Sequence, residues 1–366
     1  MILMNDFKAE PENLRVEMLS AVKRVLDSGW YILGKEVESF EHEWSQICGV
    51  QYGVGTGNGM DAIEIALRSL GVGHGDEVIT TSMTAFASVL AIIRAGAIPV
   101  LADIESDTAL LSMESFQRCI SPKTKALVLV HLYGELRNMQ AWIDICEQHG
   151  IALIEDCAQA HLATWQGRVA GAFGKVGAYS FYPTKNLGAP GDAGMVVTQD
   201  ANIAKQAICL RNYGQSMRYH HPDLGMNSRL DEMQAAMLSV RLKWLVKFTE
   251  RRRYIASFYH ARINNPLIKL PNLPQEATSH AYHLFVITCE AREKLQVHLQ
   301  SCGIQALIHY PIPIHHQDPC KNIIRDPQGL SNSELHAINC LSLPCHPQMT
   351  DDDLELVVSS ANSFTI

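Results

Sequence analysis

A lysine in a glycine- and proline-rich loop has the setting in this chain that most favours covalent chemistry. Lys185 follows the apolar run 178–181 and lies in Tyr-Pro-Thr-Lys-Asn-Leu-Gly-Ala-Pro-Gly-Asp-Ala-Gly, residues 182–194. We expect its apolar and small neighbours to desolvate the amine, lower its pKa and leave it able to form an imine with an aldehyde. Ser180, just upstream, offers a hydroxyl group to an anion. The alternative is an ordinary solvated lysine.

Two carboxylates end another apolar run, residues 151–154. Glu155 and Asp156 are followed by Cys-Ala-Gln-Ala-His, residues 157–161. A carboxylate at the end of a buried strand can pair with a cationic heteroaromatic nitrogen and keep that nitrogen protonated. Alternatively, Asp156 caps a following helix. A metal site is less favoured because no second acidic cluster accompanies the pair.

A glycine-rich turn, Gly-Thr-Gly-Asn-Gly-Met-Asp-Ala at residues 55–62, opens a predicted helix over residues 62–70. Glycines at this place let a phosphate approach the backbone N–H groups and the positive end of the helix dipole. Residues 57–62 also satisfy the G-x-G-x-x-A pattern of dinucleotide sites, but the run 50–54 before them is short and broken by Gly53. A plain turn with a helix cap remains a third reading.

Lysine, strand-end aspartate and glycine-rich turn together are what pyridoxal phosphate requires. The aldehyde would condense with Lys185, the ring nitrogen would pair with Asp156, and the phosphate would lie at the helix N-terminus. These groups must be positioned by a sheet. Predicted strands are 77–81, 98–103, 126–130, 151–155, 178–181 and 195–198, and they alternate with helical patterns such as Trp142, Ile145, Cys146 and His149 before Gly150. The alternation predicts an α/β fold with a parallel or mainly parallel sheet.

The region after Arg229 predicts a second, smaller α/β unit. It begins with a long helix over 230–263, followed by a strand at 282–288, a helix at 290–302 and two short helices within 332–366. We therefore expect a large domain, residues 1–240 with an N-terminal arm, and a small domain, residues 241–366. The chain has 366 residues, of which 47% are hydrophobic and 19% charged, which is typical of globular proteins.

The charge and cysteine content restrict partners and compartment. A net charge of −8 offers no general attraction to nucleic acid or acidic lipid, so a small-molecule partner is favoured. Ten scattered cysteines indicate buried reduced thiols and predict a cytoplasmic protein. The longest apolar stretch, 85–102, contains Arg94, so no membrane span is expected.

At these motifs the chain resembles the DegT/DnrJ/EryC1/StrS family of fold-type I sugar-nucleotide aminotransferases, over nearly its whole length. The segments that carry the resemblance are 32–34, 75–79, 155–160, 180–188, 227–236 and 309–311. The resemblance implies a large domain with a mainly parallel seven-stranded sheet, a homodimer with shared active sites and pyridoxal 5'-phosphate as cofactor. It implies no metal.

The resemblance also implies roles for single residues. Lys185 would bind the cofactor covalently and carry the proton, Asp156 would hold the ring nitrogen, and Gln159 would lie close to the ring. The other implied contacts are phosphate with Gly59, Met60 and Ser180, the ring face with Phe86, the neighbouring subunit's phosphate region with Asn227, and the sugar pocket with Tyr182, His309 and Tyr310. Arg229 and Arg211 are candidates for the glutamate carboxylate. The family often has threonine where Met60 stands, and here Ala85 separates Thr84 from Phe86.

The function implied is transfer of an amino group from L-glutamate to a nucleotide-linked keto sugar. The sequence of residues 182–194 is similar to that of family members that aminate C3 of a dTDP-linked 3-keto-6-deoxyhexose. The alternatives are a 4-aminotransferase, a sugar dehydratase and a regulatory protein, and Lys185 argues against the last two because dehydrating members carry histidine there and a binding protein is free to lose the lysine. Metal readings of Cys340, Cys345 and His346, or of the loop histidines 220–221, 309 and 315–316, are less favoured than structural or pocket-lining roles.

Overall fold

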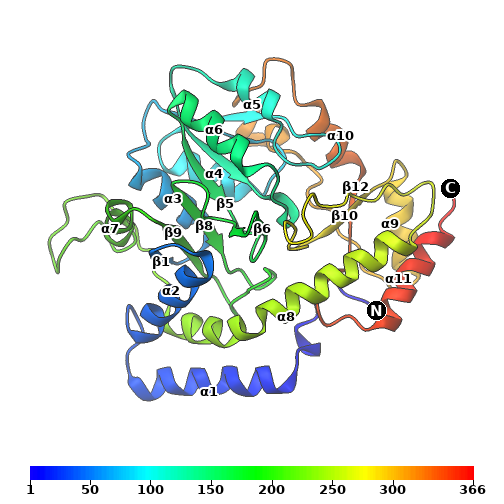
Figure 1. The fold of residues 1–366 in the computed structure, drawn as a ribbon, viewed down its shortest axis with the longest axis horizontal. Helices are drawn as coiled ribbons and strands as arrows, with labels where there is room; N and C mark the ends of the chain where they lie inside the picture. The colour runs from blue at the N-terminus through cyan, green and yellow to red at the C-terminus, as the bar shows by residue number, and fades with distance from the viewer.

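A single eight-stranded sheet lies at the centre of the computed structural model, which describes residues 1–366 (Figure 1). The strand order is β1-β9-β8-β5-β4-β2-β3-β11, and β9 is the single strand that runs in the direction opposite to the other seven. The bounds are Tyr52–Thr56 (β1), Glu77–Thr81 (β2), Ile98–Ala102 (β3), Thr124–Val130 (β4), Ala152–Asp156 (β5), Val176–Ser180 (β8), Gly194–Thr198 (β9) and Ile324–Arg325 (β11). The sheet is mainly parallel, as predicted. It has one strand more than the expected seven because the two-residue β11 pairs with β3.

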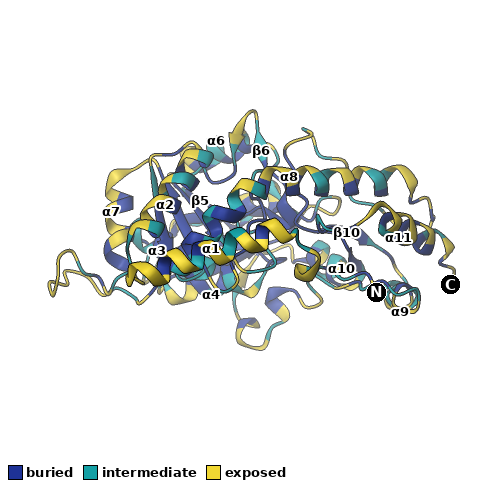
Figure 2. Cartoon of the chain, turned by 90° about the horizontal axis from the view of Figure 1, so that it is seen from below, coloured by how far each residue is buried: buried dark blue, intermediate teal, exposed yellow.

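Helices cover both faces of the sheet and bury it between two apolar clusters, as Figure 2 shows by the dark blue strands between the helices. One face carries α2 (Lys35–Cys48), α5 (Met113–Cys119), α6 (Met139–His149) and the first half of α8 (Glu232–Arg262). The other carries α3 (Gly59–Ser69), α4 (Phe86–Arg94) and α7 (Ala201–Leu210). Along β5, Leu153 joins the first cluster and Ile154 the second, since successive strand residues point to opposite faces. Burial on both faces explains why these strands read as continuous apolar runs.

The C-terminal part forms a separate apolar cluster around a two-stranded sheet. Its elements are β10 (Phe285–Thr288), α9 (Arg292–Ser301), α10 (Ser331–Asn339), β12 (Cys340–Leu343) and α11 (Asp351–Ser363). The long helix predicted over 230–263 is confirmed as α8. The strand β12 was not predicted, because its four residues stand between two helices without a turn signal of their own.

Three segments connect the two parts of the chain. The first segment is α8, whose residues pack in the apolar clusters of both parts. The predicted domain boundary at residue 240 falls inside this helix, and the boundary stays a prediction. The N-terminal arm pairs with the C-terminal part, since the Ile2 N–H group donates to the Gly303 carbonyl and the Ile2 carbonyl accepts from Gln305. The third segment is β11, which comes from the C-terminal part of the chain and pairs with β3 of the large sheet. Both termini lie at the end of the molecule that the C-terminal part forms, as Figures 1 and 2 show.

The remaining elements are short or peripheral. They are the 3-10 turns at Phe7–Ala9, Leu132–Gly134, Ile314–His316 and Asp318–Cys320, the helix α1 (Glu12–Ser28), which packs along α8, and the hairpin of β6 (Thr164–Trp165) and β7 (Arg168–Val169). None of the helices combines the length and apolar character needed to cross a membrane. All ten cysteines are unpaired, and nine of them are buried.

Candidate active site

Lys185 lies in the loop between β8 and β9, where its backbone N–H group donates to the Tyr182 carbonyl in a tight turn. The residue is half-buried. Burial of the amine lowers the pKa of Lys185 to about 8, against the opposing attraction of the Asp156 carboxylate. A substantial fraction of this amine is therefore neutral near neutral pH, and only a neutral amine can act as a nucleophile or take up a proton.

Asp156 ends β5, the strand beside β8, so its carboxylate and Lys185 leave the same edge of the sheet. The side chain is only 6% exposed. Its Oδ2 atom accepts from Ser88 Oγ at 2.8 Å, and Oδ1 accepts from the Ala158 N–H group at 3.1 Å. The alternative that Asp156 caps a helix is wrong, because turns follow it and no helix begins before α7.

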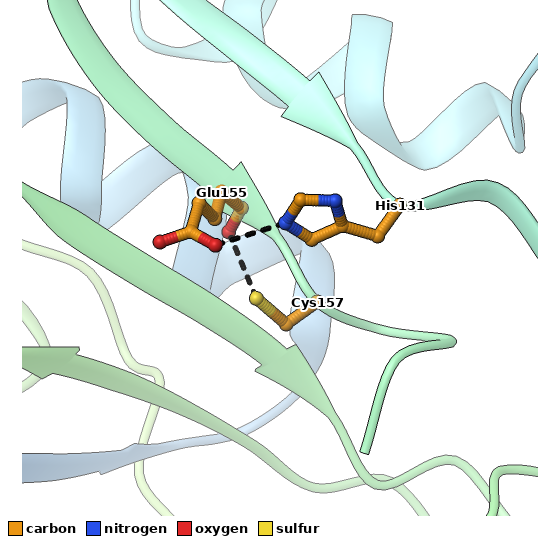
Figure 3. A group of neighbouring side chains, drawn as sticks. All are labelled: His131, Glu155 and Cys157. Carbon is orange, nitrogen blue, oxygen red and sulfur yellow. Dashed lines mark hydrogen bonds and ion pairs between the residues drawn. The ribbon is translucent and has the colours of Figure 1, made fainter. Parts of the chain in front are cut away.

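Glu155, the other carboxylate, points to the opposite face of the sheet and belongs to a different network. It is fully buried, and His131 Nε2 lies 2.9 Å from its Oε2 atom (Figure 3). Both oxygens also accept backbone N–H groups at 2.7–2.8 Å, from Gly171, Phe173 and Gly174. Each oxygen of Glu155 therefore already has two partners, and we interpret this carboxylate as a structural anchor for the 171–174 turn.

The same region holds one of two groups whose residue types could ligate a metal ion. Cys157 lies beside Glu155, its thiol directed at the Glu155 carbonyl oxygen at 3.7 Å, and burial raises the pKa of that thiol well above its ordinary value (Figure 3). A protonated thiol, and a carboxylate whose two oxygens each already accept two hydrogen bonds, are poor metal ligands. The second group is His315, His316 and Glu334, with His315 Nε2 at 3.0 Å from the carboxylate.

The glycine-rich turn brings the N-terminus of α3 against the end of β8. A Cβ atom on Gly59 would stand 2.4 Å from Ser180 Cβ, so only glycine permits this approach. Asn58 caps the helix by accepting from the Asp61 N–H group at 2.9 Å, as the plain-cap reading predicted. The N–H groups of Gly59 and Met60 nevertheless donate to no other residue of the chain, and they stay available to an anion.

The dinucleotide reading of this turn does not match the topology. The strand before it, β1, lies at the edge of the sheet and pairs only with the antiparallel β9. In a doubly wound dinucleotide fold the corresponding strand lies at the centre of a parallel sheet. The turn is therefore better suited to a single phosphate.

A hydrogen-bonded group of side chains lies close to Lys185, and it contains Gln159, His309 and Tyr310. Gln159 Nε2 donates to the Tyr310 hydroxyl at 3.3 Å, and Gln159 Oε1 accepts from the Tyr133 N–H group at 2.6 Å. The Tyr133 hydroxyl in turn donates to the His309 carbonyl at 2.5 Å. Burial, with a smaller contribution from the charge on Lys185, lowers the pKa of His309 to about 4, so this imidazole is neutral and close to the lysine.

Three of the remaining predicted residues, Phe86, Tyr182 and Asn227, are exposed on the single chain, whereas Arg229 is half-buried and Arg211 is buried. Phe86, the first residue of α4, is 36% exposed and Tyr182 is 51% exposed. Arg229 donates to the side-chain oxygen of Asn227 at 2.6 Å, and no contact joins either residue to Lys185. Arg211 does not fit the role of a carboxylate-binding residue, because its buried guanidinium already binds Glu41 and the Gly55 carbonyl.

Two residues of the cluster were not predicted. Ser88 contacts Asp156 from the first turn of α4, across 68 positions of sequence, so no local pattern marks it. Tyr133 follows the carboxyl end of β4, and this position was a usable signal because loops at that edge of a parallel sheet carry functional groups.

The cluster fits pyridoxal phosphate. It offers a half-buried amine of lowered pKa, a buried carboxylate that no cationic side chain contacts, and two uncommitted N–H groups at the start of an 11-residue helix. When bound, this cofactor supplies an electron sink for a carbanion. The chain's own residues would hold it at the ring nitrogen (Asp156) and the phosphate (Gly59, Met60 and Ser180), and Lys185 Nζ would take up and return a proton.

Comparison with known proteins shows the family and the fold of the chain. The model of the DegT/DnrJ/EryC1/StrS aminotransferase family matches residues 12–362. A dTDP-3-amino-3,4,6-trideoxy-alpha-D-glucose transaminase of Streptomyces venezuelae is 44% identical over 94% of this chain and 91% of its own length. A dTDP-3-amino-3,6-dideoxy-alpha-D-galactopyranose transaminase of Aneurinibacillus thermoaerophilus is 41% identical over 95% of each chain.

The chain is also similar to a relative whose name specifies a UDP-sugar and to a protein of known crystal structure. A UDP-N-acetyl-3-dehydro-alpha-D-glucosamine 3-aminotransferase of Acidithiobacillus ferrooxidans is 38% identical over 98% of this chain and 96% of its own. The crystal structure of DesV from S. venezuelae, in complex with a ketimine intermediate, superposes with a TM-score of 0.94 at 42% identity, and the match covers 99% of this chain and 97% of DesV.

Proposed function

The chain belongs to the DegT/DnrJ/EryC1/StrS aminotransferase family, and from this premise we propose that it transfers an amino group from L-glutamate to C3 of a dTDP-linked 3-keto-6-deoxyhexose. Sugar-nucleotide aminotransferase activity and dependence on pyridoxal phosphate come with the family. The choice of carbon, nucleotide and amino donor is the part that we propose.

The observation that carries the proposal is the placement of Lys185 and Asp156 beyond the carboxyl ends of two adjacent parallel strands, β8 and β5, where the charge of the carboxylate acts on the amine. In our proposal Asp156 keeps the cofactor's ring nitrogen positive, and Lys185 moves a proton between Nζ and the carbon that bears the nitrogen. Because burial lowers the pKa of Lys185 to about 8, the same amine can both accept and donate a proton near neutral pH. Gln159, held by Tyr133 and Tyr310, would lie against the ring.

For the sugar, we assign a pocket to Tyr182, His309 and Tyr310, and for the glutamate carboxylate we assign Arg229. The preference for C3 is supported by the names of the three relatives above, each of which is a 3-amino or 3-keto sugar enzyme. Two of them act on dTDP-sugars and one on a UDP-sugar, so UDP is the competing nucleotide.

We further propose that two copies of the chain share each active site, with Asn227 reaching the partner's phosphate region. The support is an exposed loop that precedes Asn227 and projects from the body between α7 and α8 (Figures 1 and 2). It presents Met217, Tyr219 and Leu224 to solvent, the last at 90% exposure. Exposed apolar groups of this kind are typical of a surface that a partner covers.

The test is a product assay. Enzyme loaded with cofactor should lose its visible absorbance on addition of L-glutamate, and mass spectrometry of a panel of dTDP- and UDP-linked 3-keto and 4-keto sugars should show amination of the dTDP-3-keto sugar. A Lys185→Ala variant is the control and should form no product. Amination of a 4-keto or UDP-linked sugar would correct the substrate, loss of a sugar hydroxyl without amination would indicate a dehydratase, and no spectral response to any amino acid would indicate a regulatory protein.

A further inference from the structure

Two buried hydroxyl groups lie behind Asp156, on the turn that opens α4. Ser88 is 1% exposed and its Oγ atom lies 2.8 Å from Asp156 Oδ2. Thr84, four residues earlier, is also buried, and its Oγ1 atom lies 3.1 Å from Ser88 Oγ. The three side chains form a continuous chain that ends on the proposed partner of the ring nitrogen.

The direction of this chain follows from the chemistry of its last member. A carboxylate has no proton to donate, so the Ser88 hydroxyl must donate to Asp156. Its single proton is then used, and the Ser88 oxygen can only accept from the Thr84 hydroxyl. With Ser88 on Oδ2 and the Ala158 N–H group on Oδ1, each carboxylate oxygen has one donor and keeps lone-pair capacity for a further cation.

We propose that Ser88, oriented by Thr84, is a positioning residue that fixes the Asp156 carboxylate toward the cofactor's ring nitrogen and stabilises its charged form by a hydrogen bond. This inference rests on the proposed function, because it takes Asp156 as the partner of that nitrogen. A hydrogen bond to the charged form of a buried carboxylate stabilises that form, and in a poorly solvated site this effect is stronger than in water. The proton shared between Asp156 and the ring therefore stays on the ring.

No other titratable side chain supplies this hydrogen bond. The titratable groups on which the charge of Asp156 acts are Lys185, Tyr310 and, on the side of Glu155, Cys157. The Tyr310 hydroxyl is engaged by Gln159, and the Cys157 thiol is directed at the Glu155 carbonyl oxygen. Removal of the Ser88 hydroxyl would thus leave Oδ2 without a protein donor.

The test measures the visible band of the cofactor bound to the whole enzyme as a function of pH. In Ser88→Ala the ring nitrogen becomes less positive and repels a proton on Lys185 Nζ less, so we expect the midpoint of the titration to rise by about half to one pH unit. We also expect the cofactor's dissociation constant, measured with the cofactor-free protein, to rise about tenfold, which corresponds to the loss of about 1.4 kcal/mol from one hydrogen bond to a charged group. Ser88→Thr should restore both values, and Thr84→Val should give a smaller shift in the same direction.

The matched control is Ser115→Ala. Ser115 is a fully buried serine whose hydroxyl donates to the buried carboxylate of Asp326, far along the chain from the cofactor residues. This variant should lose stability but keep the wild-type midpoint. If Ser88→Ala keeps the wild-type midpoint and dissociation constant while Asp156→Asn changes both, the inference about Ser88 is wrong and the proposed site stands. If Asp156→Asn also leaves both unchanged, the proposed site itself fails.

Discussion

The amine of Lys185 should be far more reactive at pH 7 than an ordinary lysine. Burial lowers its pKa from 10.5 to about 8. At pH 7 about one-tenth of such amines are neutral, against about 0.03% for an unperturbed lysine, so the reactive fraction should be about 300-fold larger. Because the pKa is lowered, reactivity should rise with pH through an inflection near 8 and be level above it.

The assay is labelling of the cofactor-free protein with an amine-reactive acyl ester, with the modified peptides quantified by mass spectrometry between pH 6 and 11. Lys175, which is exposed at the start of β8, is the internal reference. Asp156→Asn removes the attraction that raises the Lys185 pKa, so the inflection should move to lower pH in this variant. An inflection near 10.5, or a shift to higher pH in Asp156→Asn, would refute the reasoning.

Three further predictions concern the rest of the site. Glu155→Gln should lower the free energy of unfolding in urea by about 3 kcal/mol, because the NH2 group of an amide cannot accept a hydrogen bond and buried backbone N–H groups lose their partner. The control is Glu147→Gln on the exposed face of α6, which should change that free energy by less than about 0.5 kcal/mol. Gly59→Ala should weaken cofactor binding at least about tenfold in fluorescence titrations, since its methyl group must push the start of α3 away from Ser180; unchanged affinity would show that this approach is not needed. Asn227→Ala should weaken cofactor binding only under conditions in which sedimentation shows a dimer, and an equal loss in the monomer would contradict a contact across the subunit interface.

The long strands could be predicted from the sequence because burial on both faces of the sheet requires continuous apolar runs, and the long helix could be predicted from its length. The strand at Glu77–Thr81 was predicted at its observed bounds, and the helix predicted over 230–263 differs from α8 by a residue or two at each end. The short strands β11 and β12 were not predicted. Two or four residues carry no periodic pattern, and their pairing depends on chain segments that are distant in sequence.

The site was predictable where chemistry follows directly on a strand, and less so where it depends on partners. Asp156 and Lys185 were found because each follows an apolar run closely. The sequence analysis assigned the ring nitrogen to Asp156, but it gave no role to Glu155, whose partners at residues 131 and 171–174 are brought to it only by the fold. Ser88 reaches the site only through the packing of α4 on the sheet, and this placement is a property of the folded chain.

The most direct test of the account is to reduce the cofactor-loaded enzyme with borohydride and to locate the cofactor by peptide mass spectrometry. The account predicts that the reduced cofactor is attached to Lys185 at close to one per chain. Attachment to another lysine, or none at all in protein that shows the visible band, would contradict it.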